Sequence, residues 1–119
     1  MTVLRIVANL AARAMPETRD FYVALFGLEV VMDQGWIVTL ASGETARVQM
    51  SIASEGGSGT PVPDISIEVD DVDAIHARAR ELGAEIAYDL TDEPWGVRRF
   101  FIRAPDGALV NVLSHASHA

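Results

Sequence analysis

Residues 95–113 read WGVRRFFIRAPDGALVNVL, and this stretch decides the fold. The Pro-Asp-Gly sequence at 105–107 is typical of a tight turn. The residues on either side of it are rich in aromatic and β-branched side chains, which predicts two strands, over 97–103 and 108–114. Asn111 stands between two valines in the second strand. Its amide either lines a site or belongs to the core, where it would need hydrogen-bond partners.

The chain runs through one order of elements twice: strand, helix, strand, strand, strand. The second copy is predicted over residues 64–69, 72–82, 84–88, 97–103 and 108–114. The first copy is predicted over residues 3–12, 16–26, 28–33, 36–42 and 46–52. Pro16 suits the first turn of the first helix, and Gly27 and Gly83 each end a helix. The stretch 54–62 between the copies is rich in Gly and Ser and predicts a linker.

The register of the two copies also agrees. Gly27 and Gly83 are 56 residues apart, and Gln49 and Asn111 are 62 apart. The difference of six residues falls within DLTDEPWG at 89–96, which predicts a longer loop in the second copy. Its tryptophan either contacts a ligand or plugs the loop. Gln49 and Asn111 then hold equivalent positions on the last strand of each copy, and two matched polar amides indicate a site.

Composition limits the classes of function. The chain has 119 residues, half of them hydrophobic, so we expect one folded domain. The sequence has no cysteine, and no apolar run approaches the roughly 18 residues of a membrane span, so we expect a cytoplasmic protein without membrane contact. The short apolar stretch at the start contains Asn9, and we expect no signal peptide. The net charge of −8 argues against nucleic acid and favours a cationic ligand over an anionic one.

Three stretches resemble the vicinal oxygen chelate superfamily, which includes glyoxalase I, extradiol dioxygenases, fosfomycin-resistance enzymes and bleomycin-binding resistance proteins. They are DFYVALFGLEVV at 20–31, IEVDDVDAIHARARELGAEI at 67–86 and the stretch at 95–113. The last is similar to the G-x-R-x-F strand and D-P-D-G-N turn of that family. Ala104 and Ala108 replace the first Asp and the Asn of the turn.

The resemblance covers nearly the whole chain and implies an α+β fold of two tandem βαβββ modules, whose curved sheets form a cup. We expect module one at about 2–53, the linker at about 54–62 and module two at about 63–115, within a single domain spanning 1–119. The resemblance also implies a homodimer, with cups formed either within one chain or between two chains.

Members of the superfamily that bind a metal hold it on the first and last strands of each module. By position, the corresponding residues here are Val7, Gln49, Asp64 and Asn111. A catalytic metal usually needs about three good protein donors, and among these four only Asp64 is anionic. We therefore expect no metal cofactor. A divalent metal is kept as an alternative, because neighbouring strand residues could supply a donor if the register is shifted by one, and Glu68 is the best substitute carboxylate.

Our leading hypothesis is a metal-independent small-molecule-binding protein, similar to the bleomycin-resistance branch, that sequesters an antibiotic. Its expected site has polar lining from Gln49 and Asn111, aromatic walls from Trp36 and Trp95, and an anchor at Arg98. The alternative is a lyase, isomerase or dioxygenase of the same superfamily, acting on a small carbonyl or aromatic substrate with or without a divalent metal. Asp64 would then be the catalytic acid or base. The sequence leaves open whether the protein is an enzyme.

Overall fold

The computed structural model describes Met1, residues 4–46 and residues 49–115, and it confirms an α+β fold. Its elements in chain order are α1 (Met15–Phe26), β1 (Glu29–Asp33), β2 (Val38–Ala41), β3 (Ile65–Glu68), α2 (Val72–Glu81), β4 (Glu85–Asp92), β5 (Val97–Arg103) and β6 (Leu109–His115). Within this described part, no helix is long and apolar enough to cross a membrane.

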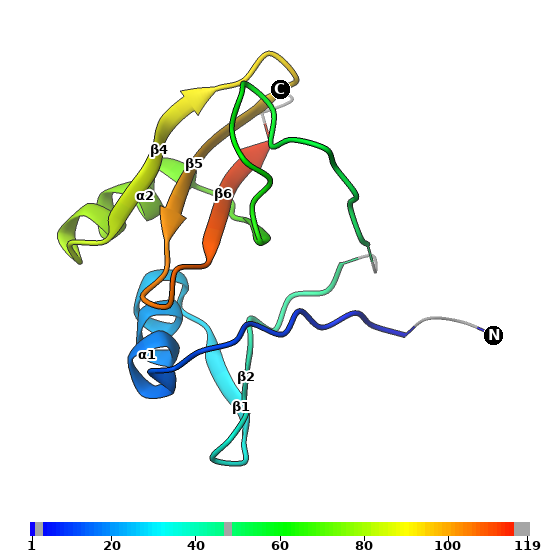
Figure 1. The fold of residues 1–119 in the computed structure, drawn as a ribbon, viewed down its shortest axis with the longest axis vertical. Helices are drawn as coiled ribbons and strands as arrows, with labels where there is room; N and C mark the ends of the chain where they lie inside the picture. Colours follow the sequence, from blue (N-terminus) through cyan, green and yellow to red (C-terminus); the bar gives the residue numbers. More distant parts are fainter. Residues whose placement is uncertain (2–3, 47–48, 116–119) are drawn as a thin grey trace.

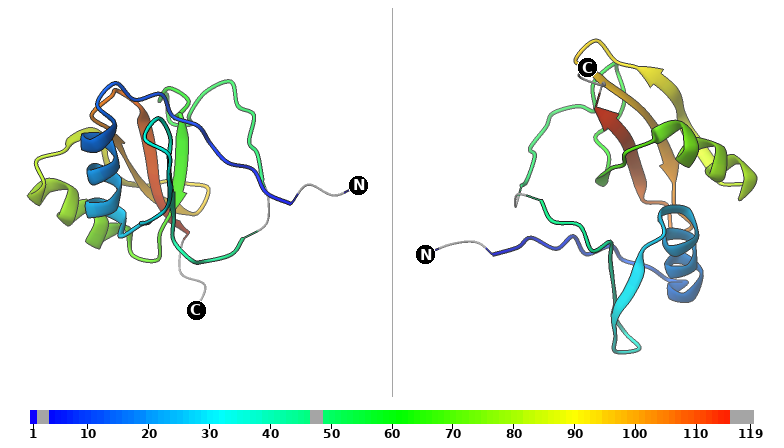
Figure 2. Two further views of the ribbon diagram at one scale, coloured as in Figure 1. Left: turned by 90° about the horizontal axis from the view of Figure 1, so that it is seen from below. Right: turned by 180° about the vertical axis from the view of Figure 1, so that it is seen from behind.

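The second half of the chain, residues 63–115, forms a complete βαβββ unit. Its sheet has the strand order β3-β6-β5-β4, in which β3 runs parallel to β6 and the other neighbours are antiparallel. Helix α2 lies across one face of this sheet (Figure 1; Figure 2, right). The Asp71 side chain begins the helix by accepting a hydrogen bond from the Ala74 N–H at 3.1 Å.

The hydrophobic core lies between α2 and this sheet and extends to α1. The side chains of β5 and β6 point alternately to the two faces of the sheet, so every second one points towards α2. The fully buried members are Phe100 and Ile102 on β5, Val110 and Val112 on β6, and Ala79 on α2. Leu25 and Tyr22 bring α1 into the core. The Arg78 side chain also joins the two helices, donating to the Leu25 carbonyl at 3.0 Å.

The first half of the chain is less complete. Helix α1 has Pro16 in its first turn and ends at Gly27, whose φ of 67° is the left-handed conformation that glycine adopts without strain. Strands β1 and β2 form a hairpin that projects away from the four-stranded sheet (Figures 1 and 2).

Two of the strands predicted for the first half are not formed in the described residues. Residues 4–12 and 49–52 have no strand structure. Val3 of the predicted 3–12 strand, and Arg47 and Val48 of the predicted 46–52 strand, lie outside the described residues. A strand needs a neighbour for its backbone hydrogen bonds, and the sheet of the first half contains only β1 and β2. The large apolar side chains left most exposed include Leu4, Val31, Met50 and Ile52.

Candidate ligand-binding site

A cavity of about 440 Å³ lies between α1, the N-terminal segment, β2 and β3. Its wall is mostly apolar and includes Val7, Leu10, Leu40, Ile65 and Ile67. Cavities of this size, with apolar walls and few polar groups, are typical of small-molecule sites. Trp36 also lines the cavity, and its indole ring is largely exposed next to the β1–β2 hairpin. Trp36, which the sequence predicts as an aromatic wall of the site, therefore lies at the wall of this cavity.

Tyr22 of α1 lines the same cavity, and its hydroxyl is a buried polar group without a hydrogen-bond partner in the described part of the chain. The residue is only 6% exposed, and its hydroxyl makes no hydrogen bond within the described residues. Its ring is fixed by Phe21 and Phe26, whose ring centroids lie 5.1 and 6.1 Å away. Most buried hydroxyls have a partner, because an unpaired one costs free energy. Sequence reasoning missed this residue, since the helical spacing indicates only that Tyr22 faces the core.

The electrostatic environment keeps the Tyr22 hydroxyl protonated. Burial is the main cause that raises its pKa, to about 12, and the carboxylates of Asp64 and Asp106 contribute further. Asp106 accepts a hydrogen bond from the Thr18 hydroxyl, which lowers the pKa of that carboxyl and keeps it ionised. The hydroxyl is therefore a donor in a region of negative potential.

The other predicted site residues do not line this cavity. Asp64 is tied to β6, because its carboxylate accepts from the Leu109 N–H at 2.7 Å. Gln49 is exposed in the extended segment before the linker. Asn111 lies on the far face of the sheet, by which we mean the face turned away from α2. The structure brings neither these three residues nor Trp95 and Arg98 into the wall of the cavity.

Asn111 is a buried amide whose side-chain nitrogen has a hydrogen-bond partner and whose oxygen has none in the described part of the chain. It is 8% exposed, its Nδ2 donates to Ser66 Oγ at 3.1 Å, and its Oδ1 has no partner within the described residues. The question raised by the sequence therefore has a mixed answer: the amide is buried like a core group, but it is not satisfied like one.

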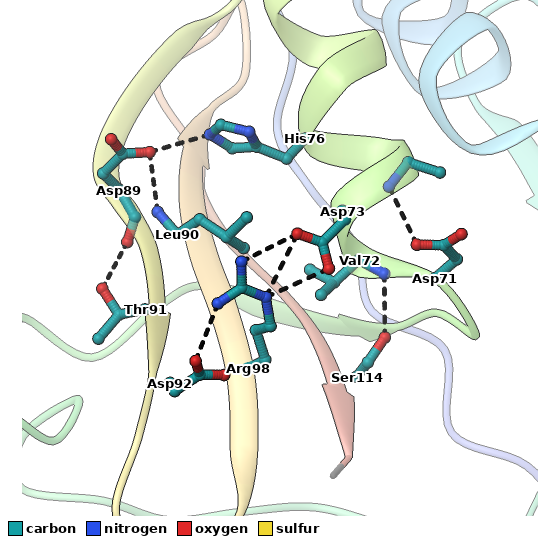
Figure 3. A network of polar contacts seen from close by, with 11 residues as sticks. Asp71, Val72, Asp73, His76, Asp89, Leu90, Thr91, Asp92, Arg98 and Ser114 are labelled. Atoms are coloured by element: carbon teal, nitrogen blue, oxygen red, sulfur yellow. Dashed lines mark hydrogen bonds and ion pairs between the residues drawn. The ribbon is translucent and has the colours of Figure 1, made fainter. Parts of the chain in front are cut away.

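Arg98 faces α2 rather than the far face of the sheet. It lies between Asp73 of α2 and Asp92 of β4, donating to their carboxylates at 2.9 and 3.1 Å (Figure 3). The hydrogen bond to Asp73 is the largest cause that raises the pKa of the guanidinium. Successive strand residues point to opposite faces, so the arginine of the far face is Arg99.

Arg99 is the centre of a buried cluster on that far face. Its side chain is 5% exposed and forms an ion pair at 2.7 Å with Glu93, which is 3% exposed. Three aromatic rings surround the guanidinium, with centroids 4.8 Å (Phe101), 5.0 Å (Trp95) and 5.4 Å (Tyr88) from its Cζ. Cation–π contacts and the ion pair together keep this charge inside the protein.

The same arginine holds the linker. It donates to the backbone carbonyls of Gly56 and Gly57 at 2.8 and 3.2 Å. Burial raises the pKa of the Glu93 carboxyl, but hydrogen bonds from Ser58, Tyr88 and Arg99 outweigh burial and lower it overall. The cluster is thus closed by hydrogen bonds between its own members, which is typical of a structural clamp.

The residues at the family's metal positions do not fit a divalent ion in the described part of the chain. No group of three His, Cys, Asp or Glu side chains converges in residues 4–46 and 49–115. Val7 has no donor atom, and the Asp64 carboxylate already accepts from the β6 backbone. His76 and His115 each contact a single carboxylate, of Asp89 and Glu68.

The family model of the Glyoxalase/Bleomycin resistance protein/Dioxygenase superfamily matches residues 4–112, and the chain belongs to this superfamily. A similar solved structure is TnmS3, an antibiotic binding protein from Streptomyces sp. CB03234, with 20% identity, a TM-score of 0.69, and coverage of 98% of this chain and 100% of that one. Another is lactoylglutathione lyase from Agrobacterium tumefaciens, with 21% identity, a TM-score of 0.63 and 88% coverage of both chains. At these identities the likeness shows the fold alone.

One curated relative is 35% identical over 79 residues, the α-1,4-glucan:maltose-1-phosphate maltosyltransferase of Mycolicibacterium smegmatis. The match covers 60% of this chain but spans only 11% of the length of that relative.

Proposed function

We propose that the protein binds a small organic molecule in the cavity between α1, β2 and β3, without a metal ion, and that it sequesters an antibiotic in this way. The observation that carries the proposal is the apolar cavity of about 440 Å³ with the Trp36 indole at its wall. A planar ligand can stack on such a ring and bury its apolar surface against the aliphatic side chains. The net charge of −8 favours neutral or cationic ligands over anions.

Metal independence is supported by the chemistry of the four mapped positions. An apolar side chain, two neutral amides and one carboxylate make a weak donor set for a transition metal. The carboxylate of Asp64 is also held by the β6 backbone. Binding would therefore rest on shape, stacking and hydrogen bonds.

We also propose that the protein is a homodimer in which a second copy covers the apolar surface of the first half. All five residues of β1 are exposed, and Leu4, Met50 and Ile52 are exposed by 73% or more. Large exposed apolar patches usually mark interfaces. Analytical ultracentrifugation at micromolar concentration tests this, and a monomer at all concentrations would refute it.

The binding proposal is tested by calorimetric titration of the full chain with antibiotics that carry a planar aromatic ring, with doxorubicin as a cationic probe and chloramphenicol as a neutral one. We expect micromolar binding of at least one, unchanged by EDTA, and a loss of tenfold or more in the Trp36→Ala variant. Trp95→Ala is the comparison, because Trp95 stacks on Arg99 and does not line the cavity. Binding lost with EDTA would overturn metal independence. A loss at Trp95 instead of Trp36 would move the site to the far face of the sheet.

A further inference from the structure

The Tyr22 hydroxyl is a donor without a partner at the wall of an apolar cavity. Tyr22 lies on α1 and is only 6% exposed, and its hydroxyl is buried and makes no hydrogen bond within the described residues. Two other polar side chains at the same wall are already engaged: Thr18 donates to Asp106, and the Asn9 amide donates to the Val7 carbonyl. The phenol is thus a free donor in a place where water is scarce.

We propose that the Tyr22 hydroxyl determines which ligands the cavity accepts, by donating a hydrogen bond to an uncharged acceptor such as a ketone, quinone or amide oxygen of an aromatic ligand. The proposal rests on the proposed function, because it requires that the cavity binds a small molecule. A ligand with such an oxygen pairs with a buried donor that otherwise has no partner. A ligand without it leaves the donor unpaired, and the free-energy cost of that unpaired group remains.

The charge around the hydroxyl decides the kind of acceptor. Asp64 and Asp106 lie close enough to raise the pKa of Tyr22, so a carboxylate or phosphate brought to this point would be repelled by two negative charges. Arg19 also lines the cavity, but its guanidinium is paired with Asp20 at 3.1 Å. A neutral carbonyl accepts the hydrogen bond without meeting this repulsion.

The expected gain is that of one neutral hydrogen bond. The hydroxyl oxygen is sealed from water in the ligand-free protein, so neighbouring side chains must shift before an acceptor reaches it. Neutral hydrogen bonds stabilise a complex by amounts that correspond to a factor of roughly 2 to 10 in affinity, and satisfying a buried donor that was unpaired places the gain in the upper part of this range even after the shift. We therefore expect a three- to tenfold preference for a ketone over the matching hydrocarbon.

The test uses three naphthalenes of nearly equal size: 2-acetylnaphthalene with a ketone, 2-ethylnaphthalene without an acceptor, and 2-naphthoate with a negative charge. Their dissociation constants are measured by fluorescence for the wild type, for Tyr22→Phe and for Tyr88→Phe. Tyr88→Phe is the matched control, because the Tyr88 hydroxyl already donates to Glu93 at 3.1 Å and lies outside the cavity wall.

We expect the wild type and Tyr88→Phe to prefer the ketone over the hydrocarbon three- to tenfold and to bind the anion most weakly. In Tyr22→Phe the preference should disappear while the hydrocarbon still binds. The carbonyl stretch of bound 2-acetylnaphthalene should also lie at lower frequency in the wild type than in Tyr22→Phe. An unchanged preference in Tyr22→Phe would overturn the role of Tyr22 and leave the binding function intact. Failure of all three compounds to bind the wild type would overturn both proposals.

Discussion

Replacing Arg99 with methionine should destabilise the protein strongly, because it breaks a buried ion pair on one side only. The Arg99 and Glu93 side chains are 5% and 3% exposed, with 2.7 Å between their charged groups. Methionine fills much of the same space but leaves the Glu93 carboxylate with only two donors, the hydroxyls of Ser58 and Tyr88. It also removes the two hydrogen bonds that hold the linker carbonyls of Gly56 and Gly57.

The size of the effect follows from the burial. Removing one partner of a buried ion pair costs about 3–5 kcal/mol, because the other charge stays buried without compensation. A domain of this size is stable by roughly 6–18 kcal/mol in total, at about 0.05–0.15 kcal/mol per residue. The midpoint of thermal unfolding should therefore fall by about 12–20 °C.

The neighbouring Arg98→Met variant is the control. Arg98 is also paired with two carboxylates, of Asp73 and Asp92, but these pairs are exposed and screened by solvent. Urea unfolding of the wild type and both variants gives the free energies, and hydrogen exchange of residues 56–60 reports whether the linker is released. An Arg99→Met loss below about 1 kcal/mol, or a loss equal to that of Arg98→Met, would refute the reasoning.

Three further predictions concern single positions. Gly57→Ala should lower the free energy of unfolding in urea more than Gly59→Ala does, and it should change the Trp95 emission. Both glycines have positive φ (84° and 76°), but only a Cβ at Gly57 would meet Trp95, at 2.8 Å. Equal losses in the two variants would contradict this packing. Asn111→Leu should change the free energy of unfolding by less than about 1 kcal/mol, since the substitution gives up one hydrogen bond and removes an unsatisfied oxygen. A loss of several kcal/mol would show that Asn111 is a structural core amide. As the pH rises from about 10 towards 12, the wild type should lose stability relative to Tyr22→Phe by about 1.4 kcal/mol per pH unit, because the pKa of Tyr22 is raised only in the folded state. A stability difference between the two proteins that stays the same in urea at pH 8, 10 and 11 would count against this.

The second half of the chain could be predicted closely because its signals are local. The turn at 105–107 and the apolar alternation around it predict strands at 97–103 and 108–114, and the structure has β5 at Val97–Arg103 and β6 at Leu109–His115. The strands expected at 3–12 and 46–52 have the same kind of composition. Strand formation there depends on a partner that is distant in the sequence, and composition does not specify that partner.

The site was harder to predict than the fold because its decisive features are single atoms. Arg98 and Arg99 are adjacent, and a shift of one residue moves a side chain to the opposite face of the sheet. The sequence predicts Arg98 as the anchor, whereas the structure places it among the carboxylates beside α2. The free hydroxyl of Tyr22 leaves no trace in the sequence, since a buried tyrosine with a partner and one without share the same helical spacing.

Stability and the proposed binding site belong to different parts of this chain. The second half has a complete sheet, a covering helix and the Arg99 cluster, so most of its core contacts lie within this half, and α1 adds Leu25 and Tyr22 to the same core. The cavity lies at the border of the first half, where the wall is formed partly by segments without strand pairing and by the exposed indole of Trp36. Sites of low local stability can adjust to a ligand at small cost to the global fold. Arg99→Met should therefore lower stability while the intact folded fraction keeps its ligand preference, and Tyr22→Phe should change that preference without unfolding the protein.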